Sequence, residues 1–360
     1  MRKKICYLAN AANYHTKKWC NYFAKKGYEI IVISLNPGEI EGIKVYSFDE
    51  KNLRTRSTIS KISYLFKTKE IKKVLKKEKP DIVHAHYASS YGLLAAILNY
   101  HPYILSAWGS DVYLFPKKNI IQKYIIKYNF KKADYIWSTS KDMAREIKLY
   151  TNKDIHITPF GVDTSIFKPN RKIKNKRLII GTVKALSKIY GINYLIRAFA
   201  ILKEKYKDIE LHIAGKGEQE RELKQLCVDL GINNDVKFLG FLESPYLVAQ
   251  TFNTFDIAVF PSLSESFGVA AIEAQACGVP VIVTKVGGLP EVVEENKTGL
   301  IIEKGNIEEL VMAIEYLILN EEKRIEMGKS GRKFVLDNYD IENNFGSVDE
   351  LYKNIIFKYK

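Results

Sequence analysis

The chain has few of the residues that would make it a disulfide-stapled, metal-binding or membrane-spanning protein. Four cysteines occur in 360 residues, at Cys6, Cys20, Cys227 and Cys277, and they form no C-x-x-C pair. We therefore expect reduced thiols in a cytoplasmic protein, without a metal cluster. No apolar run approaches the ~18–20 residues that cross a bilayer. The apolar stretch after the basic start of the chain is too short for the core of a signal peptide, so none is expected.

Acidic residues are scarce in one half of the chain only. Residues 1–170 hold 30 Lys and Arg against 14 Asp and Glu, a net charge of +16, whereas the remaining residues carry −1. A charge excess confined to one half indicates an anionic partner for that half, such as a nucleic acid, a membrane surface or a phosphorylated substrate. Otherwise, 46% hydrophobic and 27% charged residues are ordinary for a globular protein of two or three domains.

Short β-branched runs alternate with helical patterns along the whole chain. This alternation predicts parallel sheets with helices on both faces. Seven candidate strands lie in the first half, at 3–9, 28–35, 43–48, 81–85, 103–107, 134–138 and 155–158. Six lie in the second half, at 177–183, 209–214, 235–239, 255–260, 280–284 and 299–302.

Two groups of strands fit two doubly wound domains better than one sheet. A proline and a charge run near 166–177 interrupt the apolar pattern and indicate a linker. We predict one domain over 1–168, a second over 169–338, and a terminal helix over 339–360 that returns to the first domain. Doubly wound sheets bind ligands at the carboxyl ends of their strands, so a cleft between the domains is the expected active site.

The strongest motif follows the expected strand at 255–260 and continues into a helix. Its amino end offers backbone N–H groups to a phosphate, which we assign to Phe267, Gly268 and Val269. Glu265 stands just before this helix, and Glu273 lies about two turns further along. At that position Glu273 can accept hydrogen bonds from the neutral hydroxyls of a ribose. The alternative is that Glu265 only complements the charge at the helix N-terminus and that Glu273 is a surface acid.

The segment E-S-F-G-V-A-A-I-E over 265–273 resembles the E-x-F-G-x-x-x-x-E signature of the retaining GT-B glycosyltransferases of family 4, the glycosyl transferases group 1. The resemblance implies two Rossmann-like domains facing a cleft, with the acceptor in the first and a nucleotide sugar in the second. It implies that Glu265 contacts the donor sugar, that Glu273 holds the ribose, and that Ser266 belongs to the donor site. It also implies transfer with retention by a front-side mechanism.

Two further loops of the second half carry candidate donor contacts. Lys184 and Lys188 follow the strand at 177–183, where two cations suit a leaving diphosphate. The family pattern there is G-R-L-x-x-x-K-G, so a lysine replaces the usual arginine and the spacing is one residue longer; solvated loop lysines are the alternative. Gly215 and Gly217 lack a third glycine for the dinucleotide fingerprint, so they indicate either a donor-pocket loop or a tight turn.

The first half offers weaker candidates at the ends of its expected strands. They are acceptor or cleft residues by resemblance, namely Asn10, Ala11, His15, His86, Trp108 and Asp111. Ala11 stands where the family often has glycine, and Trp108 where it usually has histidine. An indole offers one N–H and a ring face instead of a histidine's two nitrogens. For His86, a structural role is the alternative to a functional one.

Two lysine-rich stretches of the first half also contain apolar residues. Residues 51–79 hold eleven Lys and Arg against two acids, and residues 117–132 hold six Lys and no acid. Basic helices with apolar residues can lie on an anionic membrane surface, and sheet-covering helices with a solvated outer face are the alternative. A peripheral position on the inner face of the plasma membrane is therefore one expectation.

The function expected from these patterns is that of a retaining hexosyltransferase. The donor would be a nucleotide diphosphate sugar, and the acceptor a lipid-linked or polysaccharide precursor in cell-surface glycan synthesis. No metal or other cofactor is expected, because lysines and a helix terminus would neutralise the diphosphate. The alternatives are a GT-B sugar-nucleotide epimerase and, in another class, a basic nucleic-acid-binding protein. We expect no nucleic acid partner, since no helix-turn-helix, zinc-ligand or RNP-like pattern occurs.

Overall fold

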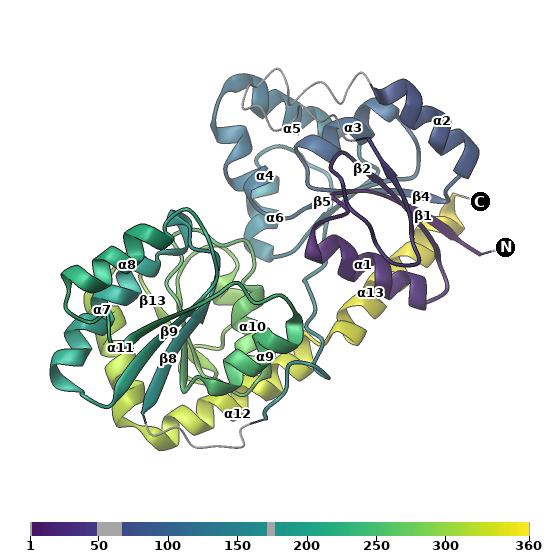
Figure 1. Ribbon diagram of the computed structural model, residues 1–360. Helices are drawn as coiled ribbons and strands as arrows, with labels where there is room; N and C mark the ends of the chain where they lie inside the picture. Colours follow the sequence, from purple (N-terminus) through teal and green to yellow (C-terminus); the bar gives the residue numbers. More distant parts are fainter. Residues whose placement is uncertain (1, 49–66, 171–176, 360) are drawn as a thin grey trace. The chain divides into compact units, whose positions relative to one another are not determined.

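The computed structural model describes residues 2–48, 67–170 and 177–359, and it divides into two compact units (Figure 1). Unit 1 comprises Met1–Thr158 and Phe345–Lys360, and unit 2 comprises Pro159–Asn344. Each unit is built on its own parallel sheet. None of the helices within the described ranges combines the length and the apolar character needed to cross a bilayer.

The sheet of unit 1 has seven parallel strands in the order β3-β2-β1-β4-β5-β6-β7. The strands are β1 (Lys4–Leu8), β2 (Glu29–Ser34), β3 (Lys44–Ser47), β4 (Ile82–His86), β5 (Tyr103–Ala107), β6 (Tyr135–Ser138) and β7 (Ile155–Ile157). The central strands β4 and β5 are buried along their whole length, as expected where helices cover both faces of a parallel sheet.

Helices of unit 1 cover two chemically different faces of this sheet. The elements are α1 (Tyr14–Lys25), α2 (Thr68–Glu78), α3 (Ser90–Leu98), α4 (Ser110–Tyr113), η2 (Phe115–Lys117), α5 (Ile120–Lys132), α6 (Lys141–Ile147) and the long α13 (Ile341–Lys358). Figure 1 shows α2, α3 and α5 on one side of the sheet and α1 with α13 on the other. The first side is mainly aliphatic, with Leu8 and Ala85 of the strands packed against Leu75, Leu94 and Ile126 of the helices.

The opposite face is aromatic and polar, because strand side chains alternate between the two faces. Tyr7, His84 and Trp137 point to this side, where Tyr352 of α13 packs among them. The Tyr352 hydroxyl lies 2.6 Å from His84 Nδ1 and 3.2 Å from the Tyr7 hydroxyl, and His84 Nε2 lies 2.7 Å from Ser106 Oγ. A buried chain of hydrogen bonds thus fastens the last helix to the first sheet.

The sheet of unit 2 has six parallel strands in the order β10-β9-β8-β11-β12-β13. They are β8 (Leu178–Val183), β9 (Ile209–Ala214), β10 (Val236–Gly240), β11 (Ile257–Phe260), β12 (Val281–Thr284) and β13 (Gly299–Ile302). The connecting elements are η3 (Lys188–Tyr190), α7 (Ile192–Lys205), α8 (Glu220–Asp229), α9 (Pro245–Thr254), α10 (Val269–Ala276), η4 (Leu289–Glu291), α11 (Ile307–Leu319) and α12 (Glu321–Asn338). Helices α7, α8 and α11 pack on the aliphatic core, and α10 packs between α9 and α12.

The strands predicted in both halves are confirmed, and with them the two Rossmann-like α/β domains. The structure places the change of unit at 158/159 rather than at the predicted 168/169. Residues 159–168 belong with unit 2 because Phe160 lies 6.2 Å from the Phe267 ring and Val162 forms a bridge with Asp340. The last residues from Phe345 onward belong to unit 1. The predicted cleft between the domains stays a prediction.

Candidate active site

The strand order of unit 2 contains one switch point, between β8 and β11. From β8 the chain continues outward through β9 and β10, and it then returns to β11 on the other side of β8. The loops that follow β8 and β11 therefore lead to helices on opposite faces of the sheet. In doubly wound sheets such a point, at the carboxyl edge, is where ligands bind. Lys184 follows β8 and Glu265 follows β11, so both stand at this edge.

Lys184 and Glu265 form an ion pair across the switch point. Lys184 Nζ lies 2.5 Å from Glu265 Oε2, and the two side chains are 14% and 11% exposed. The ammonium group also lies 4.6 Å from the centre of the Tyr190 ring. Burial alone would lower the pKa of Lys184, but the charge of Glu265 and the hydrogen bond to it, together with the neighbouring Tyr190 and the charge of Glu273, outweigh burial, and the pKa is raised. A permanent cation is thus held in a nearly dry position by a carboxylate.

Two glycines after β12 hold the backbone of Glu265 in place. Gly287 has a φ of +51°, and a Cβ there would lie 1.7 Å from the carbonyl oxygen of Glu265. The N–H of Gly288 donates to the same oxygen at 3.3 Å. Only glycine allows this approach and this left-handed backbone. Neither glycine was assigned a role from the sequence; the available signal was the G-G pair separated by two residues from the buried strand β12.

The loop after β9 packs against the loop that carries Lys184. A Cβ on Gly215 would lie 1.9 Å from the carbonyl oxygen of Lys184, and one on Gly217 would lie 2.2 Å from that of Leu186. The N–H of Leu186 donates to the carbonyl of Lys216 at 3.0 Å. Close backbone packing therefore accounts for both glycines, and a direct contact with a donor remains a prediction.

Helix α10 begins two residues after Phe267, the first residue whose amide we placed at the amino end of this helix. It spans Val269–Ala276, and its N-cap is Gly268 with a φ of +105°. The amides that open the helix are therefore those of Val269 and Ala270 rather than that of Phe267. The Phe267 side chain is 2% exposed and packs edge-on against Tyr339 at 5.6 Å. The buried ring anchors the loop, and the left-handed backbone of Gly268 marks the start of the helix.

The remaining donor-site candidates lie around the same ion pair. Glu273 sits in the second turn of α10, half-buried, and its charge contributes to the raised pKa of Lys184. The backbone N–H of Ser266 donates to Glu265 Oε1 at 3.2 Å. Lys188 opens η3 and is exposed. Unit 2 thus brings Lys184, Glu265 and Glu273 together, with Lys188 in the loop between β8 and α7.

In unit 1, Asn10 and Ala11 shape the turn after β1. Asn10 Oδ1 accepts the N–H of Ala12 at 3.0 Å, and the N–H of the buried Ala11 donates to Ser34 Oγ at 3.2 Å. Asn13 then caps α1 by accepting the N–H of His15 at 2.8 Å. These residues position His15 in the first turn of the helix, half-buried.

The rings of His86 and Trp108 pack against each other, tilted by 37°, at the carboxyl edge of the same sheet. Their ring centres are 4.4 Å apart, and the His15 ring lies edge-on at 6.1 Å from the indole. His86 is 1% exposed, and neither of its ring nitrogens has a hydrogen-bond partner within the described part of the chain. Burial, with a smaller effect from His15, lowers the pKa of His86 to about 3. The ring is therefore neutral at physiological pH.

Asp111, which we predicted to be a cleft residue, is buried instead. Its carboxylate accepts backbone N–H groups from Ala88 at 2.5 Å, Gly109 at 2.7 Å and Trp108 at 3.3 Å. Burial outweighs these bonds and raises the pKa of Asp111 to about 6. The side chain thus fastens the loop after β5 to the loop after β4, and it points at backbone amides rather than at an acceptor.

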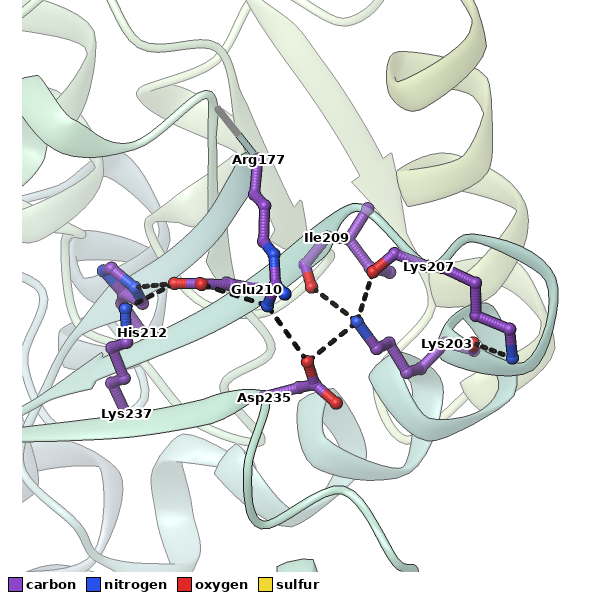
Figure 2. A network of polar contacts seen from close by, with 8 residues as sticks. All are labelled: Arg177, Lys203, Lys207, Ile209, Glu210, His212, Asp235 and Lys237. Carbon is purple, nitrogen blue, oxygen red and sulfur yellow. Dashed lines mark hydrogen bonds and ion pairs between the residues drawn. The ribbon is translucent and has the colours of Figure 1, made fainter. Parts of the chain in front are cut away.

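A second polar cluster of unit 2 lies on the sheet beside α9 (Figure 2). Glu210 accepts from Arg177 at 3.3 Å, His212 at 3.0 Å and Lys237 at 2.6 Å, next to a pocket of about 660 Å³. The hydrogen bond from Lys237 is the largest cause that lowers the pKa of Glu210, to about 2. Its three partners hold this carboxylate ionised, so it is a poor proton acceptor, and it joins β9 to β10 and to the residue before β8.

No group of three or more His, Cys, Asp or Glu side chains in the described ranges is arranged to hold a metal ion.

Both units of the chain resemble known glycosyltransferases. The family model of glycosyl transferases group 1 matches residues 163–334, and that of glycosyl transferase 4-like proteins matches residues 4–140. An uncharacterized glycosyltransferase of Methanocaldococcus jannaschii is 32% identical over 277 residues, which are 76% of each chain. This chain belongs to the glycosyl transferases of group 1.

Two further proteins resemble this glycosyltransferase over nearly its whole length. The N-acetyl-alpha-D-glucosaminyl L-malate synthase of Bacillus anthracis is 25% identical over 353 residues, 92% of this chain and 91% of that protein. The structure of HepE from Anabaena in complex with UDP-glucose superimposes with a TM-score of 0.81 at 19% identity, covering 98% of this chain and 99% of that one. The latter likeness concerns the fold, and the GT-B architecture expected from the sequence is confirmed.

Proposed function

We propose that this glycosyltransferase moves a hexose from a nucleoside diphosphate sugar to an acceptor with retention at the anomeric carbon. The observation that carries the proposal is the convergence of Lys184, Glu265 and Glu273 at the switch point of unit 2. Two acids and a permanent cation at that edge suit a ligand with hydroxyls on both sides of a diphosphate. The related synthase of B. anthracis is named for the synthesis of N-acetyl-alpha-D-glucosaminyl L-malate, and the HepE structure is a complex with UDP-glucose. Both support a nucleoside diphosphate sugar as the donor.

Each group has a chemically reasonable task in that reaction. Glu273 is expected to accept hydrogen bonds from the ribose, and Glu265 from the transferred sugar. The amides of Val269 and Ala270 at the start of α10, with the exposed Lys188, are expected to face the diphosphate. We propose that these groups neutralise the leaving diphosphate without a metal.

The ion pair of Lys184 suggests how charge moves during the reaction. Glu265 neutralises Lys184 when no donor is bound. As the glycosidic bond breaks, the leaving phosphate gains negative charge and competes with Glu265 for the same ammonium group. A cation that is already desolvated and oriented stabilises developing charge without reorganisation. In the front-side mechanism, the leaving phosphate then helps to take the proton of the acceptor hydroxyl.

The acceptor site is proposed for unit 1, around His15, His86 and Trp108. The half-buried Trp108 indole and the half-buried His15 ring beside it offer aromatic faces and polar edges, which suit a glycan or a lipid-linked glycan, and the buried His86 packs against the indole. We propose a precursor of cell-surface polysaccharide as the acceptor, used at the cytoplasmic side of the plasma membrane. The positive charge of residues 1–170 supports attachment to anionic lipid.

Glu273→Ala and Glu265→Ala separate the proposed roles. Calorimetry with UDP and GDP should show that Glu273→Ala weakens binding of the preferred nucleotide by about 1.5–3 kcal/mol, the value of a charge-assisted hydrogen bond. Glu265→Ala should leave that affinity nearly intact and lower turnover with the full sugar donor. Glu308→Ala, at an exposed position of α11, is the matched control and should change neither. Identical behaviour of the two site variants would contradict the division of roles. A product whose anomeric proton coupling shows the anomer opposite to that of the donor would contradict retention.

A further inference from the structure

The outward face of α5 carries large apolar side chains where a solvated helix would carry polar ones. The exposed residues and their exposed fractions are Ile120 (62%), Ile121 (68%), Tyr124 (65%) and Tyr128 (40%). At 100° per residue these four side chains fall within one stripe along the helix. The stripe lies opposite the buried side chains of Ile126 and Phe130, which pack into the core of unit 1. Core packing therefore does not account for the exposed set.

Lysines surround this apolar stripe, and no acid lies among them. Residues 117–132 contain six lysines and neither Asp nor Glu. Lys117 pairs with Glu146 at 2.8 Å. Within the described part of the chain, Lys118, Lys123 and Lys127 have no carboxylate within 4.0 Å, and all three are exposed. The surface therefore presents uncompensated positive charge around an apolar centre.

The structure distinguishes α5 from the other lysine-rich segment. Part of residues 51–79 lies outside the described residues, and the rest forms α2. In α2 the apolar Ile71 and Leu75 are 0% and 2% exposed, so that helix presents lysines without an apolar centre. Both helices contact α3 on the same side of the sheet, as Figure 1 shows. Their lysines can thus act on one partner, but only α5 can insert side chains.

We propose that the outward face of α5 docks on a bilayer rich in anionic lipid. This inference refines the membrane attachment suggested under the proposed function and does not depend on the chemistry of the donor. Ile120 and Ile121 would enter the boundary between headgroups and acyl chains, while Tyr124 and Tyr128 keep their hydroxyls at the headgroups. Lysine stems lie along apolar surface and carry their charges to lipid phosphates. A second copy of this chain fits less well, because two lysine-rich faces repel each other.

Tyr124→Trp tests insertion directly. The three native tryptophans lie at 19, 108 and 137, so the wild-type emission can be subtracted. Adding vesicles of phosphatidylcholine with phosphatidylglycerol should shift the emission of the new indole to the blue, and brominated lipid should quench it. Tyr316→Trp, at a position of α11 that is 41% exposed, is the matched control and should show neither effect. Equal responses of the two variants, or no response from Tyr124→Trp, would overturn the proposal.

Vesicle co-sedimentation separates the apolar and the electrostatic parts. Ile121→Ser with Tyr124→Ser should remove the fraction that stays bound at high salt. Lys123→Glu with Lys127→Glu should abolish binding at low salt as well. Met312→Ser with Tyr316→Ser, the same kind of change on an exposed part of α11, should bind vesicles as the wild type does.

Two further readouts keep the result independent of folding and of the proposed function. Every variant should retain the wild-type urea midpoint seen by tryptophan fluorescence, which follows unit 1, and the wild-type affinity for nucleoside diphosphate in unit 2, so a loss of vesicle binding cannot be assigned to a misfolded chain. Full vesicle binding by Ile121→Ser with Tyr124→Ser would contradict docking through α5. A concentration-dependent dimer that this double variant abolishes, with no vesicle binding by the wild type, would assign the face to self-association instead.

Discussion

Removing the charge of Lys184 should destabilise unit 2 while leaving unit 1 unchanged. Lys184→Met keeps an unbranched apolar stem and deletes the ammonium group that lies 2.5 Å from Glu265 Oε2. At an effective dielectric constant of about 20, two unit charges at this distance attract by about 6–7 kcal/mol. Desolvation of the lysine offsets several kcal/mol of that attraction. Since both side chains are more than four-fifths buried, a net loss of about 2–3 kcal/mol is expected.

The distribution of tryptophan makes this prediction measurable in the intact chain. Trp19, Trp108 and Trp137 all lie in unit 1, so tryptophan fluorescence in urea follows that unit, whereas circular dichroism follows both. Lys184→Met should move the transition seen by circular dichroism to lower urea without moving the fluorescence transition. Lys188→Met, at an exposed position of the same loop, is the control and should stay within about 0.5 kcal/mol of the wild type.

A double-mutant cycle with Glu265→Gln decides whether the pair itself is responsible. The coupling free energy between the two positions should be about 1.5–3 kcal/mol, and the double variant should be more stable than the sum of the single changes implies. A coupling near zero would refute the reasoning, and so would a Lys184→Met protein as stable as the control.

Three further predictions concern the backbone of the donor loop and the aromatic face of unit 1. Gly287→Ala should lower the melting temperature and the nucleotide affinity together, because φ is +51° and the new Cβ meets a carbonyl oxygen; Gly346→Ala, in α13 with open space around it, should be neutral or stabilising by up to about 1 kcal/mol. Tyr352→Phe leaves His84 Nδ1 without its 2.6 Å partner and should lower the free energy of unfolding of unit 1 by about 1–3 kcal/mol, measured by tryptophan fluorescence in urea; an unchanged midpoint would show that water replaces the hydroxyl. Burial holds the pKa of His84 well below 6.5 and that of His86 at about 3, so only the unfolded chain takes up these protons as the pH falls below 6.5. Each histidine therefore lowers the free energy of unfolding by up to about 1.4 kcal/mol per pH unit in this range. His86→Phe should flatten the decline of stability between pH 6 and 5 relative to the wild type.

The order of strands along the chain could be predicted well because burial on both faces leaves a strong local pattern. Strands such as β4 and β12 are apolar and β-branched over their whole length, and turn residues bound them. The start of α10 could not be predicted correctly from the sequence, because Phe267 is apolar and continues the hydrophobic pattern of the helix. The ring packs against Tyr339 instead, and Gly268 takes a left-handed conformation that ends the loop.

In the candidate site too, some features could be predicted from the sequence and others could not. The spacing of Glu265 and Glu273 is local and could be recognised along the chain. The roles of Asp111 and the two glycines at 287–288 could not, because their partners are backbone atoms of other loops. Asp111 was predicted to be a cleft residue by resemblance to the family alone, and only the structure shows the three amides that it holds.

By itself, the sequence determined the fold class, the family and the residues that gather at the carboxyl edge of the second sheet, since hydrophobic periodicity and the 265–273 motif are properties of neighbours in the chain. Tertiary structure decided which of those residues touch. Lys184 and Glu265 are 81 positions apart and meet only because β8 and β11 are adjacent in the sheet. It also decided that Ile71 and Leu75 of α2 are buried, whereas α5 buries Ile126 and Phe130 and leaves a second set of large apolar residues exposed. Local pattern determines which elements form, and the long-range contacts of the sheet determine which side chains are left to act.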